Sequence, residues 1–289
     1  MENEKYSKLK LGERGAIISI LAYILLSILK LVVGYMSNSA ALRADGLNNT
    51  TDIIASIAVL IGLKLARRPP DKDHGYGHWK SETIASMVAS FIMVVVGLQV
   101  IIEAITSMFE RNNQSPDILA AYVGVFSAIV MYFVYRYNKK LARRINSKAV
   151  MAAAKDNISD AWVSIGTAVG IFGSQFNLPW LDTLTAFVVG VLICKTAWDI
   201  FRESSHELSD GFDEQKLQLY MDVMTQIDGV KGVKEIKGRN YGNNEVIDVI
   251  ILVNSTLNIN EAHDIATNVE RLMEKEYGVY DVHVHVEPN

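Results

Sequence analysis

Four oxygen-bearing side chains lie within two stretches of otherwise apolar sequence. Asn48 and Asp52 are four residues apart in the first stretch, and Asp156 and Asp160 repeat this spacing in the second. Residues four apart lie on one face of a helix, one turn from each other. Two such helices facing each other would bring four oxygen ligands together at one depth. The spacing favours a cation site over the structural explanation, in which buried polar residues only join helices or cap their ends.

Asp45 precedes Asn48 by three residues and shares its helical face. We expect this side chain near the outer mouth of the helices. There, a structural or capping role explains it as well as binding of a cation does.

The chemistry of the four ligands restricts the cation. Three carboxylates and one amide form an all-oxygen set without histidine or cysteine. Oxygen ligands suit Mn²⁺, Mg²⁺ and Ca²⁺, whereas zinc and copper favour nitrogen and sulfur; zinc stays open because most sites bind it more tightly than manganese. Crowded carboxylates repel one another, so at least one should hold a proton until a metal displaces it. This predicts metal moving one way and protons the other.

The stretches that carry these residues are long enough to cross a membrane. Half of the 289 residues are hydrophobic, and about 20 apolar residues span a hydrocarbon core of roughly 30 Å. We predict six spanning helices, at residues 15–36, 40–65, 83–108, 117–137, 149–173 and 179–201. The second and fifth carry most of the polar residues, so we expect them inside the bundle, shielded from lipid. The first 15 residues are too polar for a cleaved signal peptide.

Basic residues indicate the orientation of the helices. They are concentrated before the first helix and in the second and fourth loops, at residues 5–14, 64–80 and 136–148, and are few in the other loops. By the positive-inside rule, both termini are cytoplasmic. We expect an integral protein of the cell membrane.

The composition argues against several other classes of protein. A net charge of −4 provides no basic face for nucleic acid. The single cysteine, Cys194, excludes an internal disulfide and a thiolate metal cluster, and is best explained as a small buried core residue. The sequence shows neither a nucleophile–base pair nor a nucleotide-binding loop, so we do not expect an enzyme.

The sequence becomes more polar after residue 207. A helical pattern (KLQLYMDVMTQI) precedes two strand patterns separated by the turn Gly242-Asn243-Asn244. A second helix (INEAHDIATNVERLMEKEYG) ends at a glycine, and a last strand (YDVHVHVEP) follows. The order α-β-β-α-β predicts a small α+β domain. We therefore divide the chain into a transport domain of residues 1–207 and a cytosolic domain of residues 208–289.

Several motifs, in order along nearly the whole chain, resemble the cation diffusion facilitator family. They are SNSAALRADGLNNTTDIIAS, PPDKDHGYGHWKSE, AKDNISD, NEAHDIA and the terminal VHVHVEP. The resemblance implies six transmembrane helices, a ferredoxin-like cytosolic domain and a homodimer. It also implies export of a divalent metal in exchange for protons, with the metal as cargo and no resident cofactor.

The resemblance assigns the transport site to Asn48, Asp52, Asp156 and Asp160. Zinc-transporting members commonly have a histidine in this quartet, and this sequence has none. The quartet instead resembles the manganese branch, which agrees with the ligand chemistry. We therefore expect manganese, then iron(II), with zinc or cobalt as alternatives.

The resemblance also suggests two further metal sites. Asp71, His74 and His78 match a loop site of some members, although histidines packing the loop on a dimer partner are an equal explanation. His263, His285 and Glu287 match part of a cytosolic regulatory site, and His283 shares a strand face with His285. Zinc relatives have two further histidines where this chain has Lys234 and Ile250, so a single weaker site is expected.

Other charged residues receive structural explanations. Lys80 and Asp210 match positions that pair between the membrane and cytosolic halves of relatives. Lys30 is expected to snorkel or to pair with an intramembrane acid. Asp182 is expected to cap the start of the sixth helix.

Two other functions remain open. The chain would be a membrane-bound metal sensor if the cytosolic domain alone bound metal, or a Na⁺/H⁺ or Ca²⁺/H⁺ exchanger that uses the same carboxylates. A sensor has no need of paired acids inside the membrane, so the sequence favours the metal transporter.

Overall fold

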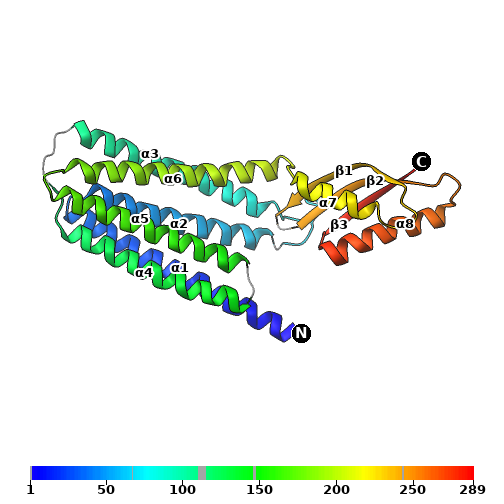
Figure 1. The fold of residues 1–289 in the computed structure, drawn as a ribbon, viewed down its shortest axis with the longest axis horizontal. Helices are drawn as coiled ribbons and strands as arrows, with labels where there is room; N and C mark the ends of the chain where they lie inside the picture. The colour runs from blue at the N-terminus through cyan, green and yellow to red at the C-terminus, as the bar shows by residue number, and fades with distance from the viewer. Residues whose placement is uncertain (1, 67, 110–114, 146–147, 243) are drawn as a thin grey trace. The chain divides into compact units, whose positions relative to one another are not determined.

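The computed structural model describes residues 2–66, 68–109, 115–145, 148–242 and 244–289. Six long helices come first (Figure 1): α1 (Glu2–Met36), α2 (Ala40–Ala66), α3 (Ser81–Phe109), α4 (Leu119–Ile145), α5 (Lys148–Ser174) and α6 (Trp180–Leu208). They lie where the sequence predicts helices, with most ends shifted by only a few residues. The chain divides into two compact units, residues 1–57 with 89–199 and residues 58–88 with 200–289.

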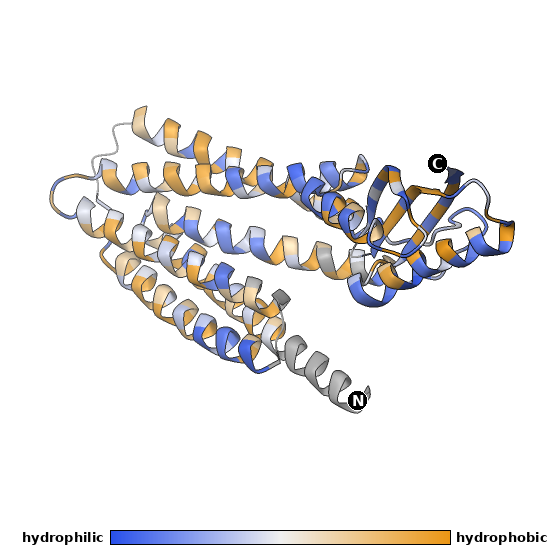
Figure 2. Ribbon diagram, turned by 45° about the vertical axis from the view of Figure 1, so that its right-hand side comes forward, coloured by the Kyte–Doolittle hydropathy of each residue, from blue (hydrophilic) through white to orange (hydrophobic). Residues whose placement is uncertain are grey.

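Within the described residues, five helices are long and apolar enough to cross a membrane: α1 from Gly15, α2, α3, α4 to Arg144, and α6. The predicted fifth span is also a helix, but α5 does not meet this criterion, and its first half carries Lys155, Asp156 and Asp160. Hydrophobic residues run along most of the length of the long helices (Figure 2). Large apolar side chains such as Leu25 and Val95 are exposed, whereas Lys30 and Asp45 are completely buried. A membrane protein has this distribution, because lipid solvates apolar side chains and polar ones turn inward.

The helices of the first unit pack through small residues and short apolar contacts. α1, α4 and α5 lie side by side, and Leu26, Met131 and Ala161 meet between them. A glycine allows α3 to approach α6, since a Cβ at Gly97 would lie 2.6 Å from the sulfur of Cys194. Cys194 is therefore a packing residue, as predicted, although it is only half-buried.

The C-terminal segment of the second unit has the predicted α-β-β-α-β order. Its elements are α7 (Glu214–Met224), β1 (Gly232–Tyr241), β2 (Asn244–Val253), α8 (Ile259–Leu272), a π-helical turn (Met273–Tyr277) and β3 (Asp281–Pro288). The sheet order is β1-β2-β3, with β1 antiparallel and β3 parallel to β2. Ile247, Ile251 and Val269 are fully buried in the core that the helices and the sheet share. This is a ferredoxin-like α+β fold.

Local signals set the limits of these elements. Gly242 turns the β1–β2 hairpin with φ of 58°, a conformation that costs glycine little; Asn243 of the predicted turn lies outside the described residues. Asn258 and Glu261 form a capping box at the start of α8. Gly278, with φ of 70°, follows the π-helical turn and ends the helical segment where the sequence predicts its end.

We predict that Asn258→Ala destabilises α8. The asparagine side chain accepts hydrogen bonds from the amides of Asn260 and Glu261, and loss of such a cap typically costs about 1 kcal/mol. Amide hydrogen exchange in the full chain should show faster exchange in the first turns of α8. Asn268→Ala, an exposed change in the same helix, is the control and should leave exchange there unchanged. Equal exchange in both variants would contradict the capping role.

Candidate metal transport site

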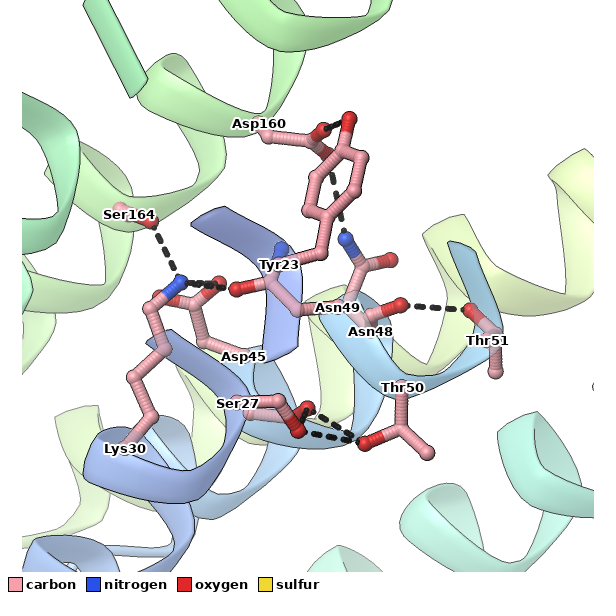
Figure 3. Close-up of polar contacts among 11 residues, drawn as sticks. Tyr23, Ser27, Lys30, Asp45, Asn48, Asn49, Thr50, Thr51, Asp160 and Ser164 are labelled. Carbon is pink, nitrogen blue, oxygen red and sulfur yellow. Dashed lines mark hydrogen bonds and ion pairs between the residues drawn. The ribbon is translucent and has the colours of Figure 1, made fainter. Parts of the chain in front are cut away.

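The two polar helices meet at Asn48 and Asp160. The side-chain amide nitrogen of Asn48, on α2, donates to Oδ1 of Asp160, on α5, over 3.3 Å. Figure 3 shows the two side chains turned toward each other. One α2 residue and one α5 residue of the predicted quartet are therefore in contact. Rotation of the Asn48 amide would present its oxygen, instead of its nitrogen, to a cation.

Asp52 lies one helical turn after Asn48 and is half-buried. Its Oδ2 is buried and has no hydrogen-bond partner, so this oxygen is free to bind a cation. The charges of Asp160 and Asp156 act on the Asp52 carboxylate. A cation between these acids would relieve both their mutual repulsion and the unsatisfied oxygen, which is how an all-oxygen site attracts its ion.

Asp156 and Asp160 differ in exposure, although both belong to the same face of α5. Asp156 is exposed, whereas only 8% of Asp160 is accessible. The three aspartates of the quartet do not bring ligand atoms within 4.8 Å of one another in the described residues. Asn48 contacts Asp160 directly, whereas Asp156, one turn before Asp160 on α5, is exposed.

Tyr23 of α1 holds the second oxygen of Asp160. Its hydroxyl donates to Oδ2 over 2.7 Å and accepts a hydrogen bond from Asn157 over 3.0 Å. Asn157 in turn accepts from Ser19 and Asn138, so buried hydrogen bonds extend from Asp160 to α4. Oδ1 is the oxygen left to face α2. Sequence reasoning missed these residues, although polar residues of α1 one turn apart, Ser19 and Tyr23, were a readable signal.

Asp45 lies in the second turn of α2 and is completely buried beside Lys30; its expected position near the outer mouth stays a prediction. Their side chains form an ion pair of 2.9 Å, which confirms the predicted pairing of Lys30 with an intramembrane acid. The lysine also donates to Asn49 and Ser164 (Figure 3). Asp45 thus has the structural role that we weighed against ligation.

Asp182 caps a different helix from the one predicted. It lies inside the first turn of α6, and the backbone amide of Ala40 and the hydroxyl of Ser39 each donate to it over 2.6 Å. The amide of Ala41 is a further donor at 3.4 Å. The prediction of a cap on its own helix is wrong, because a carboxylate also satisfies the free amides of a neighbouring helix start. Asp182 therefore fixes the beginning of α2, on which Asn48 and Asp52 lie.

Asp71, His74 and His78 form a compact cluster in the loop between α2 and α3. Oδ1 of Asp71 lies 3.0 Å from Nδ1 of His74, and Oδ2 lies 3.4 Å from Nε2 of His78. In the described residues, this is the group of histidine and acidic side chains whose ligand atoms come within 4.8 Å of one another. Hydrogen bonds from the side chain and backbone of His74 lower the pKa of Asp71. The loop could therefore present two nitrogens and one oxygen to a cation.

The candidate cytosolic ligands are not gathered in this way within one chain. His283 contacts Asp248 and Asp281, over 3.2 and 3.1 Å, and His263 is exposed on α8. Glu287 pairs with Lys234 over 2.6 Å and lies 3.9 Å from His285. Lys234 thus engages one of the candidate ligands. The cytosolic metal site stays a prediction.

The expected pair Lys80–Asp210 is present, with 2.7 Å between the ammonium nitrogen and a carboxylate oxygen. The ammonium also lies 5.0 Å from the centre of the Tyr241 ring. Within the second unit, these contacts join the start of α3 to the end of α6 and to β1.

The class of protein follows from this fold and from comparison with known families. Residues 16–209 match the family model described as the cation efflux transmembrane domain, and residues 212–289 match the cation efflux protein cytoplasmic domain. The chain therefore belongs to the cation diffusion facilitator (cation efflux) family, as its motifs predict. It is an integral membrane transporter for metal efflux.

Three curated relatives match almost the full length of the chain. It is similar to the manganese efflux system protein MneS of Bacillus subtilis (strain 168), with 55% identity over 99% of this chain and 98% of that protein. In the same organism, the uncharacterized transporter YdbO is 49% identical over 99% of both chains. The manganese efflux system protein MneP is 31% identical over 96% of this chain and 97% of that protein.

We predict that Tyr23→Phe destabilises the helical domain. The change leaves the buried Oδ2 of Asp160 and the amide of Asn157 without their partner, which typically costs about 1 to 3 kcal/mol. Denaturant titration in detergent micelles should detect the loss. Tyr122→Phe, at an exposed ring, is the matched control. Equal stability of the two variants would show that Asp160 does not depend on Tyr23.

A second prediction concerns the loop cluster. If it binds a cation, Mn²⁺ titration of the purified protein by calorimetry should lose one binding equivalent in the double variant His74→Ala/His78→Ala. Asp73→Asn changes an exposed acid of the same loop and should keep that equivalent. Unchanged stoichiometry in the double variant would leave the histidines a packing role.

Proposed function

We propose that this chain exports Mn²⁺ from the cytoplasm in exchange for protons, through Asn48, Asp52, Asp156 and Asp160. The observation that carries the proposal is the all-oxygen quartet, in which Asn48 contacts Asp160 and a buried oxygen of Asp52 has no partner. Oxygen ligands without histidine suit manganese better than zinc. Similarity to MneS and MneP, two proteins named for manganese efflux, supports the same metal.

The contacts suggest how the site would accept its ion. Tyr23 engages Oδ2 of Asp160, so Oδ1 faces Asn48 and is the oxygen offered to the metal. Asp156 is exposed and would meet the ion first, whereas Asp52 supplies the oxygen without a hydrogen bond. Binding would replace the hydrogen bond between Asn48 and Asp160 by two oxygen–metal contacts.

Proton exchange follows from the same carboxylates. The charges of Asp156 and Asp160 act on the Asp52 carboxylate, and interacting carboxylates in a low dielectric do not all keep their charge without a cation. The metal-free site would therefore hold a proton that the metal displaces. After the metal leaves, a proton from the opposite side would restore the empty site. The exchange needs no other titratable group.

In this proposal, both termini of the chain lie in the cytoplasm, and two copies of the chain form a homodimer. Orientation rests on the basic loops, and dimerisation rests on the match of residues 212–289 to the family's cytoplasmic domain. Loop and cytosolic metal sites, where present, would respond to the metal concentration on the side from which the ion is taken.

Asp160→Asn should abolish transport in proteoliposomes. Loss of groups that only support metal ligands costs about 10- to 100-fold, so loss of a ligand carboxylate should reduce Mn²⁺-dependent proton flux at least about 100-fold. Asp199→Asn, an exposed acid of α6, is the control and should retain flux. Retained flux in Asp160→Asn would refute the site.

A panel of Mn²⁺, Fe²⁺, Co²⁺, Zn²⁺ and Ca²⁺ in the same vesicles tests the choice of metal. Flux with manganese that exceeds flux with zinc supports the proposal. Flux with zinc alone, or with calcium alone, would assign the quartet to another cargo.

A further inference from the structure

Lys30 is buried among three helices of the first unit. None of its side chain is exposed, and its ammonium nitrogen lies 2.9 Å from Oδ1 of Asp45. It donates to Oδ1 of Asn49 over 2.7 Å and to the hydroxyl of Ser164 over 2.9 Å (Figure 3). Two hydrogen bonds and one ion pair thus engage the ammonium group. Burial of the charge is therefore compensated, and the lysine head group has a fixed position.

The partners of Lys30 are close in sequence to the proposed ligands on both helices. On α2, Asn49 is adjacent to Asn48, and Asp45 precedes Asn48 by three residues. On α5, Ser164 follows Asp160 by four residues, which is one turn, or about 6 Å along the helix. Lys30, itself on α1, thus contacts α2 and α5 one turn away from the quartet.

The rest of the packing shows why such a contact is needed. α5 packs closely on α4 and α1, whereas α2 is joined to α1 by Ser27, which donates to the carbonyl of Gly46 over 3.1 Å. α2 and α5 meet through the side chains of Asn48 and Asp160, and the Lys30 ammonium links the same two helices. The metal site needs ligands from both helices at one depth.

We propose that Lys30 is a positioning residue for ion binding, which ties α2 to α5 so that the two ligand pairs stay opposite each other. The inference rests on the proposed function of the quartet. Lys30 also engages Asp45, the acid that shares a helical face with Asn48 and Asp52, and thereby keeps this carboxylate in a structural role. The lysine does not touch the ion.

Ser164→Ala removes only the contact of Lys30 with α5, and is the first test. A hydrogen bond contributes about 0.5 to 1.5 kcal/mol net, so KM for Mn²⁺ flux in proteoliposomes should rise about two- to tenfold, with Vmax nearly unchanged. General destabilisation would instead lower Vmax through loss of active protein. Ser127→Ala is the matched control, because Ser127 is equally buried and its hydroxyl has no hydrogen-bond partner. An unchanged KM in Ser164→Ala would overturn the proposal.

A second test separates positioning from neutralisation of charge. Lys30→Met alone leaves the buried Asp45 unpaired and threatens folding, so it is combined with Asp45→Leu. A double variant that elutes as folded protein and has a raised KM supports positioning. A double variant with wild-type KM would show that Lys30 serves only to neutralise Asp45.

Calorimetric titration with Mn²⁺ distinguishes failure of this inference from failure of the proposed function. If the wild type neither binds nor transports manganese, the cargo is wrong. If the wild type does both, and Ser164→Ala binds manganese with unchanged affinity, the positioning role alone is wrong.

Discussion

The transport domain depends on the compensation of charge inside a bundle of helices. Asp160 is nearly inaccessible, and a carboxylate in such a place is costly unless other groups satisfy its oxygens. Tyr23 donates to one oxygen and Asn48 to the other. These two contacts come from α1 and α2, so the need to satisfy one carboxylate on α5 brings three helices together.

The other acids of the helical domain have different surroundings. Asp45 has a permanent cation in Lys30, and Asp182 accepts the free amides at the start of α2. Both carboxylates are engaged by groups of the protein itself and have structural roles. Asp52 retains a buried oxygen without a partner, and Asp156 is open to its surroundings. Oxygens of Asp45 also lack a hydrogen-bond partner, but its charge is balanced by the Lys30 ammonium, whereas Asp52 and Asp156 belong to the proposed metal site.

The sequence predicts the helices and the facing pairs because both depend on local periodicity. The length of the apolar segments predicts the spanning helices. The four-residue spacing predicts that Asn48 and Asp52 share one helical face, and that Asp156 and Asp160 share another. It did not predict Tyr23 as a partner of Asp160, since that contact joins residues 137 positions apart. Asp182 was assigned to the wrong helix for the same reason. Its local sequence shows that it lies at the start of α6, but it does not show that the side chain reaches the start of α2.

The cytosolic domain shows the same limit in another form. Turn and stop glycines predict the limits of its elements well, because Gly242 and Gly278 act on their own neighbours. The candidate metal ligands depend instead on which strands lie side by side. Lys234 on β1 reaches Glu287 on β3, and His283 turns to Asp248 on the adjacent β2. His283 and Glu287 already have oppositely charged neighbours, so a cation bound by them would have to displace those contacts. At the proposed transport site, by contrast, the buried Oδ2 of Asp52 has no hydrogen-bond partner. The intramembrane quartet is therefore better suited to bind a cation than the candidate cytosolic site. The difference lies in the contacts of the side chains and not in the types of residue present.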